Sequence, residues 1–148
     1  MTSSGYFSNS PGIMNSVIGG IVGDNYAKVI NCYNIGTVST KYNVSGGIIG
    51  INREGSTLRN CYNIGRIDGT TFVGGIVGYN KGNIEGICYY LDSSAEYGAN
   101  DVSNINEIKP ESNEYMKSVN FLTQLNSYGK IFKLSDKEDN SYPIFYWQ

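Results

Sequence analysis

The sequence predicts a mainly β fold, namely a parallel β-solenoid of about three coils with a period near 28 residues, followed by a small α+β C-terminal cap. Repetition is the first reason: GGIVG at 19–23 returns as GGIIG at 46–50 and as GGIVG at 74–78, and NCYNIG at 31–36 returns at 60–65 and, altered, at 87–92. Second, the 19 glycines and 13 tyrosines favour short strands joined by tight turns. Third, no Asn-Gly turn joins these segments, which argues against hairpins.

Each repeat is expected to form one coil of three short strands. In residues 46–73, GGIIGIN and LRNCYNI are strands, and RIDG is a third short segment. One coil cannot bury its own apolar face, so neighbouring coils should stack in parallel. Residues 1–92 then form the solenoid, with coils at about 1–18 (partial), 19–45, 46–73 and 74–92. The partial coil resembles the tail of an earlier repeat, so we expect an upstream repeat.

The repeat ends after Leu91. Residues 93–111 are polar and irregular and are predicted to be a linker or loop. Residues 112–148 predict a helix with Ser112 as N-cap, and then two strands at 130–134 and 142–148. We expect this part to cover the open end of the solenoid, because exposed strand edges promote aggregation.

Asparagines recur at fixed positions of the repeat and are predicted to form structural ladders. Stacked Asn side chains can pass amide hydrogen bonds between coils and tolerate a left-handed backbone. The predicted ladders are Asn25, Asn52 and Asn80, then Asn31 with Asn60, and Asn34 with Asn63.

The three cysteines, Cys32, Cys61 and Cys88, share one repeat position. A disulfide or a three-thiolate metal site is one interpretation. The odd number, the absence of a CxxC pair and the apolar context favour an internal ladder of small hydrophobic residues. We therefore expect all three thiols to be unreactive until the chain unfolds.

Tyr33, Tyr62 and Tyr89 each follow one of these cysteines, and their role stays open. If they face outward, the row of rings could bind sugars or apolar ligands. If they are buried, they form an ordinary aromatic ladder that contributes packing energy.

Composition disfavours several functions. Charged residues make up 16% of the chain, the net charge is −2 and histidine is absent. This balance argues against nucleic-acid binding and removes the commonest general base and zinc ligand. No apolar run is long enough to span a membrane, and no signal peptide is recognised at residues 1–11, so we interpret the chain as a fragment of an exported protein.

Carboxylates in the coils were considered as catalytic groups, because parallel β-helices also host polysaccharide lyases and hydrolases. Among Asp24, Glu54, Asp68 and Glu85, only Asp24 and Glu54 are expected to approach each other. The acidic turn at 136–140 does not fit a calcium loop. We therefore predict no catalytic residue, no metal site and no cofactor.

The blocks GGIVG, NCYNIG, GGIIG, NCYNIG and GGIVGYN resemble the GLUG-type repeats of bacterial surface and secreted proteins. Such repeats also occur beside the catalytic domain of some IgA-cleaving metallopeptidases. The ending NSYPIFYWQ resembles the segment that closes such repeats, with Ser141 at a usual Gly and Phe145 at a usual Leu. The resemblance implies an extracellular or cell-surface location in a bacterium and carries over no catalytic residue.

These observations predict a non-catalytic structural or adhesive repeat module within a longer chain. Its expected partners are host or bacterial glycans or surface proteins, without nucleic acid and without membrane insertion. The alternatives are a carbohydrate-binding module that uses the Tyr ladder and, less favoured, a polysaccharide-active β-helix enzyme. Recognition is expected at the polar turns that vary between repeats, DNYAK, INREGS and YNKGN.

Overall fold

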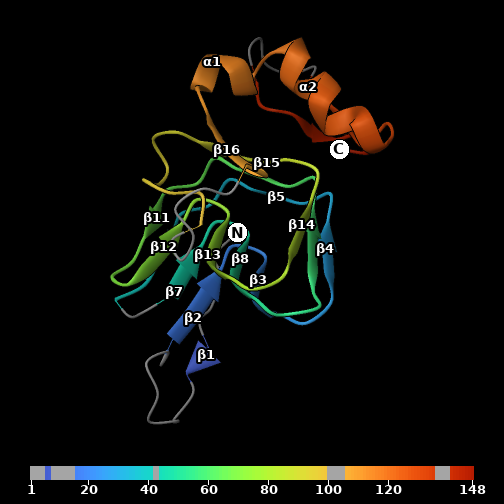
Figure 1. Cartoon of the computed structure of the whole chain (residues 1–148). Helices are drawn as coiled ribbons and strands as arrows, with labels where there is room; N and C mark the ends of the chain where they lie inside the picture. Colours follow the sequence, from blue (N-terminus) through green and yellow to red (C-terminus); the bar gives the residue numbers. More distant parts are fainter. Residues whose placement is uncertain (1–5, 8–15, 42–43, 100–105, 136–140) are drawn as a thin grey trace. The chain divides into compact units, whose positions relative to one another are not determined.

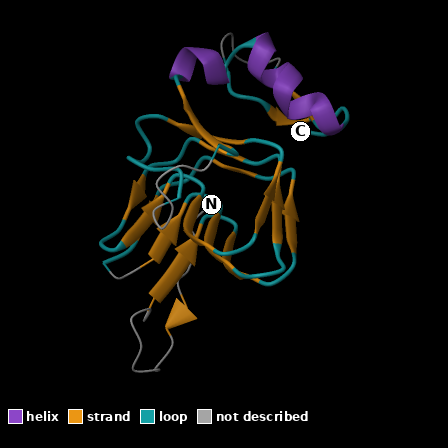
Figure 2. Cartoon of the chain, viewed as in Figure 1, coloured by secondary structure: helices purple, strands orange, loops and turns teal. Residues whose placement is uncertain are grey.

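The computed structural model describes residues 6–7, 16–41, 44–99, 106–135 and 141–148. The chain divides into two compact units, Met1–Pro110 and Glu111–Gln148. Short strands and loops make up most of the first unit, and the helices belong to the second (Figure 2).

The strands of the first unit form five small sheets, and successive repeats supply neighbouring strands (Figure 1). Strands that are named next to each other within a sheet are hydrogen-bonded neighbours. The sheets are β1 (Tyr6–Phe7), β2 (Ser16–Gly19), β7 (Val44–Gly46) and β12 (Phe72–Gly74); β13 (Val77–Asn80), β8 (Ile49–Asn52) and β3 (Val22–Asn25); β14 (Asn83–Glu85), β9 (Thr57–Arg59) and β4 (Lys28–Ile30); β16 (Ile108–Glu111), β15 (Cys88–Leu91), β10 (Tyr62–Asn63) and β5 (Tyr33–Asn34); and β11 (Ile67–Asp68) and β6 (Val38–Ser39).

We call β2–β6 the first strand set, β7–β11 the second and β12–β15 the third. Neighbouring sets pair in parallel, and their registers align repeated residues: Asn25 faces Asn52, which faces Asn80. The pair of β1 with β2 is antiparallel. The second set thus lies between the first and the third.

Aliphatic residues of the repeats fill the core of the first unit. A single cluster joins side chains of all three sets, because equivalent residues lie above one another in the parallel stack. Its most buried members are Ile48, Ile49, Leu58, Cys61, Ile76, Val77 and Cys88. The fold is mainly β, with parallel strands in stacked sheets, which is consistent with a β-solenoid-like fold.

Residues after Leu91 differ from the predicted linker, since several of them extend the stack. The carbonyl of Ser94 accepts from the amide of Ile67, and that of Gly98 accepts from Ile76 and Val77. Ala99 forms a bridge with Val77, and β16 pairs with β15. The Asn63 side chain also donates to the Ser94 hydroxyl at 3.5 Å. Because the other contacts named here are made by backbone groups, the repeat pattern of the sequence does not predict them. Residues 100–105 of the predicted linker lie outside the described residues.

The second unit contains α1 (Asn113–Met116), α2 (Val119–Leu125), the 3-10 turn η1 (Asn126–Tyr128) and the antiparallel pair β17 (Phe132–Lys133) and β18 (Ile144–Phe145). Ser112 is the N-cap of α1, and its hydroxyl accepts from the amide of Tyr115 at 3.2 Å. The single predicted helix is divided, because Ser118 caps a second helix through the amide of Phe121 at 3.1 Å.

Buried Met116, Phe121, Leu125 and Phe132 hold the second unit together. The Asn126 side chain adds hydrogen bonds to the backbone of Ile131 and Phe132. The capping role expected for residues 112–148 concerns the placement of the two units, and it stays a prediction.

Candidate functional site

Asparagine side chains connect neighbouring strand sets through their amides. The Asn25 Nδ2 donates to Asn52 Oδ1 at 2.8 Å, and Asn52 Nδ2 donates to Asn80 Oδ1 at 2.9 Å. Asn34 donates to Asn63, and Asn60 donates to Asn31, each at 2.8 Å. The ladder residues are therefore engaged in joining the sets.

The same asparagines shape the turns next to them. Asn25 Oδ1 accepts from the amide of Ala27 at 3.1 Å, and Asn34 and Asn63 make the equivalent bonds to Gly36 and Gly65. Asn31 and Asn60 have φ values of 54° and 52°, a left-handed conformation that Asn tolerates better than most residues. Their function is to close the corners of the stack.

Tyr33, Tyr62 and Tyr89 lie in register on β5, β10 and β15. The rings of Tyr33 and Tyr62 are stacked, with centroids 5.2 Å apart and planes 6° apart. Tyr62 has 0% and Tyr89 has 5% of its surface exposed. A ligand cannot stack on a ring without exposed surface, so these two side chains do not form the open binding row considered above. Packing is the role that this geometry favours.

The three cysteines also lie in register, but they are not equivalent. Cys61 and Cys88 are buried, whereas Cys32 is half-buried at the edge of the stack. The Cys32 amide lies 3.4 Å from the Cys61 sulfur, and the Cys32 and Cys61 thiols donate to the carbonyls of Ile30 and Arg59. The expectation that all three thiols are internal is therefore wrong for Cys32, because β5 has no further strand on its outer side in the described part of the chain.

Burial and hydrogen bonding separate the acidities of these thiols. A hydrogen bond with Cys61 lowers the pKa of Cys32 to about 7, against the opposing effect of partial burial. Burial, together with hydrogen bonds to Cys32 and Cys88, raises the pKa of Cys61 well above its ordinary value. The ladder therefore has an acidic thiol at its accessible end and a protonated one behind it.

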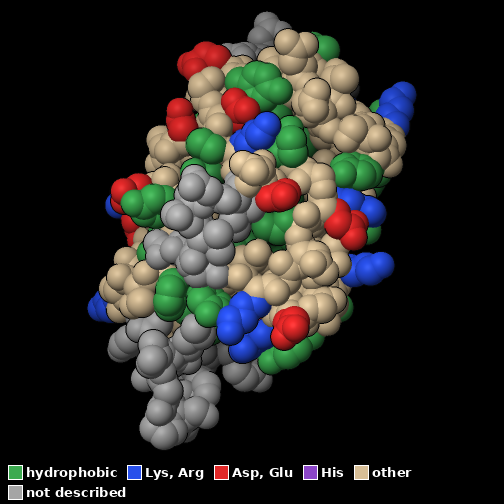
Figure 3. Space-filling model, viewed as in Figure 1, with side chains coloured by type: hydrophobic (Ala, Val, Ile, Leu, Met, Phe, Trp, Pro, Cys, Tyr) green, Lys and Arg blue, Asp and Glu red, His purple; other side chains and the backbone are tan. Residues whose placement is uncertain are grey.

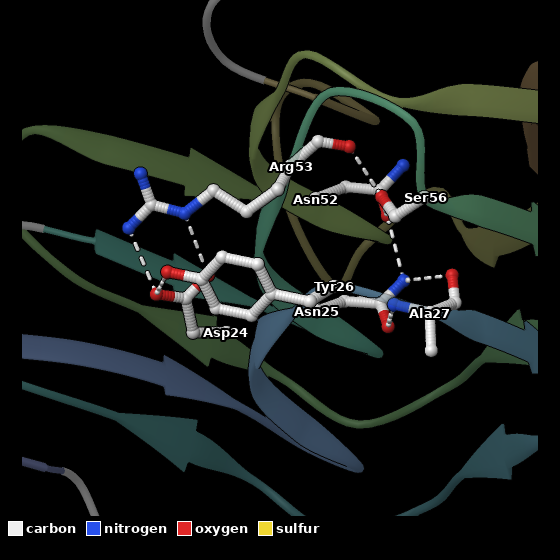
Figure 4. A network of polar contacts seen from close by, with 7 residues as sticks. All are labelled: Asp24, Asn25, Tyr26, Ala27, Asn52, Arg53 and Ser56. Carbon is white, nitrogen blue, oxygen red and sulfur yellow. Dashed lines mark hydrogen bonds and ion pairs between the residues drawn. The ribbon is translucent and has the colours of Figure 1, made fainter.

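A network of polar contacts joins the ends of β3 and β8 and the turns that follow them (Figure 4). The Arg53 guanidinium binds the Asp24 carboxylate through two hydrogen bonds of 2.8 Å, and its Cζ lies 5.5 Å from the centroid of the Tyr26 ring. The Tyr26 hydroxyl donates to the same carboxylate at 3.4 Å. The hydrogen bonds to Asp24 raise the pKa of Arg53. The turns therefore present an aromatic ring and an ion pair together.

Two of the other coil carboxylates considered as catalytic candidates, Asp68 and Glu85, also form ion pairs. Arg59 pairs with Glu85 at 3.4 Å, and Arg66 pairs with Asp68 at 2.9 Å. The Asp24 carboxylate is held by Arg53 at 2.8 Å. No group of residues suited to a metal ion occurs in the described part of the chain. The acidic turn at 136–140 lies outside that part.

Charge is mixed on the surface seen in Figure 3, where basic and acidic side chains lie interspersed. Among the described residues, no helix has the length and apolarity needed to cross a membrane.

Sequence reasoning placed recognition at the variable turns but missed the partnership of Tyr26 and Arg53. The signal was available in the alignment of the repeats, since both residues directly follow a ladder asparagine. Lys81 occupies the same position after Asn80, and its Nζ lies 5.5 Å from the centroid of the Tyr79 ring. Backbone bonds from Arg53 to Asn25 and from Lys81 to Asn52 bring this row together.

Comparisons of the chain with models of protein families, with characterised proteins and with solved structures gave no match.

Proposed function

We propose that the chain is a non-catalytic repeat module of a bacterial cell-surface or secreted protein, with three coils of about 28 residues at 19–45, 46–73 and 74–92. The coils form a scaffold, and the variable turns form its display surface. The GLUG-like blocks motivate both the family assignment and the extracellular location.

One observation carries this proposal: invariant and variable residues of the repeat have different surroundings. The repeated Asn side chains are occupied by hydrogen bonds between strand sets. At the neighbouring variable position, Tyr26 and Lys81 are exposed and Arg53 is half-buried. Conserving a scaffold while changing its outer row is the arrangement used by repeat proteins that present a binding surface.

The row of Tyr26, Arg53 and Lys81 suits a partner with hydroxyl and anionic groups. An aromatic face stacks on a sugar ring, and guanidinium or ammonium groups bind carboxylates and sulfates. We therefore propose acidic glycans, or glycosylated surface proteins, as the partner class. Because Tyr62 and Tyr89 of the Tyr ladder are buried, we place this proposed contact at the turns.

A glycan array with the full chain tests this proposal. We expect binding to acidic glycans that falls at least about tenfold in a Tyr26→Ala variant, because one stacking contact is lost. Ile35→Ala is the matched control, since Ile35 is exposed but lies outside the turns. Absence of binding by the wild-type chain, or an equal loss in both variants, would overturn the display role.

The polysaccharide-active alternative has its own assay. Pectins, alginates and glucans are incubated with the chain and then examined for new reducing ends or unsaturated products. We expect none, because a carboxylate tied to Arg53 is a poor acid or base. Turnover that disappears in Asp24→Asn would contradict the proposal.

A further inference from the structure

The cysteine ladder is not used by the proposed display role. Three thiols occupy equivalent positions beside β5, β10 and β15, and they adjoin the main apolar cluster. Cys32 is half-buried, whereas Cys61 and Cys88 have 0% exposure. One end of a row of nucleophilic groups is therefore within reach of solvent.

We propose that Cys32 and Cys61 form a peroxide-oxidisable pair, in which Cys32 reacts first and Cys61 closes a disulfide between neighbouring strands. The oxidant is a hydroperoxide small enough to reach the half-buried sulfur, such as hydrogen peroxide. Cys88 is a spectator.

Strand register gives this pair a spacing that a disulfide can bridge. Tyr33 faces Tyr62, and Asn34 faces Asn63, so Cys32 and Cys61 stand opposite each other on parallel neighbours. Adjacent strands lie about 4.8 Å apart, within the range of roughly 4.4–6.8 Å between the Cα atoms of bridged cysteines. The Cys61 sulfur, 3.4 Å from the Cys32 amide, already lies against the backbone of its partner.

Thiol acidity supports the same order of events. The thiolate is the nucleophile, and a pKa of about 7 leaves much of Cys32 ionised near neutral pH. Cys61 keeps its proton because burial, together with hydrogen bonds involving Cys32 and Cys88, raises its pKa. The strands β9 and β14, which precede Cys61 and Cys88 in the chain, end in the charged residues Arg59 and Glu85, and these two side chains pair with each other.

The chemistry balances with one hydroperoxide and two thiols. The Cys32 thiolate attacks a peroxide oxygen, so that an S–O bond forms, the O–O bond breaks, and the released oxyanion takes a proton and leaves as water or an alcohol. The Cys61 sulfur then attacks the sulfenic sulfur of Cys32. An S–S bond forms, the S–O bond breaks, and the hydroxyl leaves with the Cys61 proton as water.

Alkylation of the native full chain provides the first test. Iodoacetamide should label Cys32 at least about tenfold faster than Cys61 or Cys88, because thiolate character and access both favour it. The rate should rise with pH along a titration curve whose midpoint lies at about 7, since the pKa of Cys32 is lowered to that value. Equal labelling of the three thiols, or a midpoint near that of an ordinary thiol, would overturn the proposal. No variant is needed for this measurement.

Peroxide treatment followed by peptide mass spectrometry provides the second test. We expect the Cys32 and Cys61 peptides to be linked with loss of two hydrogen atoms, and the link to disappear with a thiol reductant. Cys88→Ser should retain the link, and Cys61→Ser should leave Cys32 as a sulfenic acid that dimedone traps. A link between Cys61 and Cys88, or irreversible oxidation of Cys32 in the wild type, would overturn the assignment.

Discussion

The first and second strand sets contain nearly the same residues but bury them to different extents. Ile48 and Ile49 of the second set have 0% exposure, whereas their counterparts Ile21 and Val22 are half-buried. Four of the five strands of the second set have a strand on both sides, whereas four of the five strands of the first set have a strand on one side only in the described structure. Position in the stack, and not residue type, therefore decides how much each repeat contributes to stability.

Glycine environments show the same contrast at closer range. A Cβ added at Gly50 would lie 2.5 Å from Val17 Cγ1 and 2.6 Å from the Gly23 oxygen. At Gly23, the same added atom would come no closer than 3.4 Å to the Val17 oxygen. The added atom at Gly50 meets residues of the neighbouring first strand set, whereas Gly23 itself belongs to that set.

Removing the same apolar side chain from each set should give the largest difference. We expect Ile48→Ala to lower the free energy of unfolding by about 4 kcal/mol, since it leaves a cavity in the enclosed core. Ile21→Ala should cost about half as much, because part of that side chain already contacts water. Chemical denaturation followed by circular dichroism measures both values, and equal losses would remove the contrast.

Adding a methyl group instead of removing one sharpens the comparison. Gly50→Ala should cost about 3 kcal/mol, because the new atom meets backbone and side-chain atoms that cannot all move aside. Gly23→Ala should change stability by less than about 1 kcal/mol, since 3.4 Å is close to an ordinary contact. Thermal unfolding of the two variants compares them, and a well-tolerated Gly50→Ala would speak against the tight parallel stack.

Polar ladders should follow the same order with smaller effects. Asn52 donates to Asn80 and accepts from Asn25 and from the Ser56 hydroxyl, so Asn52→Ala should cost about 2 kcal/mol. Asn25→Ala should cost about 1 kcal/mol, because Asn25 joins only one neighbouring ladder residue. The same denaturation assay applies, and a larger loss for Asn25 than for Asn52 would contradict the ladder account.

The smallest effect is expected at the exposed bridge between the two sets. Asp24 and Arg53 retain 34% and 42% of their side-chain exposure, so Asp24→Asn should lower stability by less than about 1 kcal/mol. The loss should shrink further in high salt, because exposed charges are screened. Denaturation at two salt concentrations measures this, and a loss that salt leaves unchanged would indicate a buried role for the pair.

Parallel stacking could be predicted from the sequence because equivalent residues must face each other when identical segments stack. The N-cap at Ser112 was readable for a similar reason, since a serine before a helical pattern satisfies a free backbone amide. Ser118 carried the same local signal for a second cap, but the continuous apolar spacing hid it.

Other features depend on position or on backbone contacts that no residue type reveals. Cys32 and Cys61 have nearly identical neighbours in sequence, and only the position of Cys32 at the edge of the stack leaves it less buried than Cys61. Ser94 and Gly98 join the stack through their backbone carbonyls, which any residue type could supply. Tyr26 and Arg53 occupy the same position of the repeat, 27 residues apart, but they are different residue types. Aligning the repeats therefore shows that the two residues lie close together, but it does not show that they interact.

Amide hydrogen exchange of the full chain tests the central claim most directly: the second strand set is enclosed between parallel neighbours while the first lies at an edge. The Ile21 and Ile48 amides make equivalent hydrogen bonds, to the Ile48 and Ile76 carbonyls at 3.0 and 2.9 Å. We predict that Ile48 exchanges only through global unfolding, and that Ile21 exchanges about 100-fold faster through local opening. Equal protection of the two amides, or faster exchange at Ile48, would contradict the account.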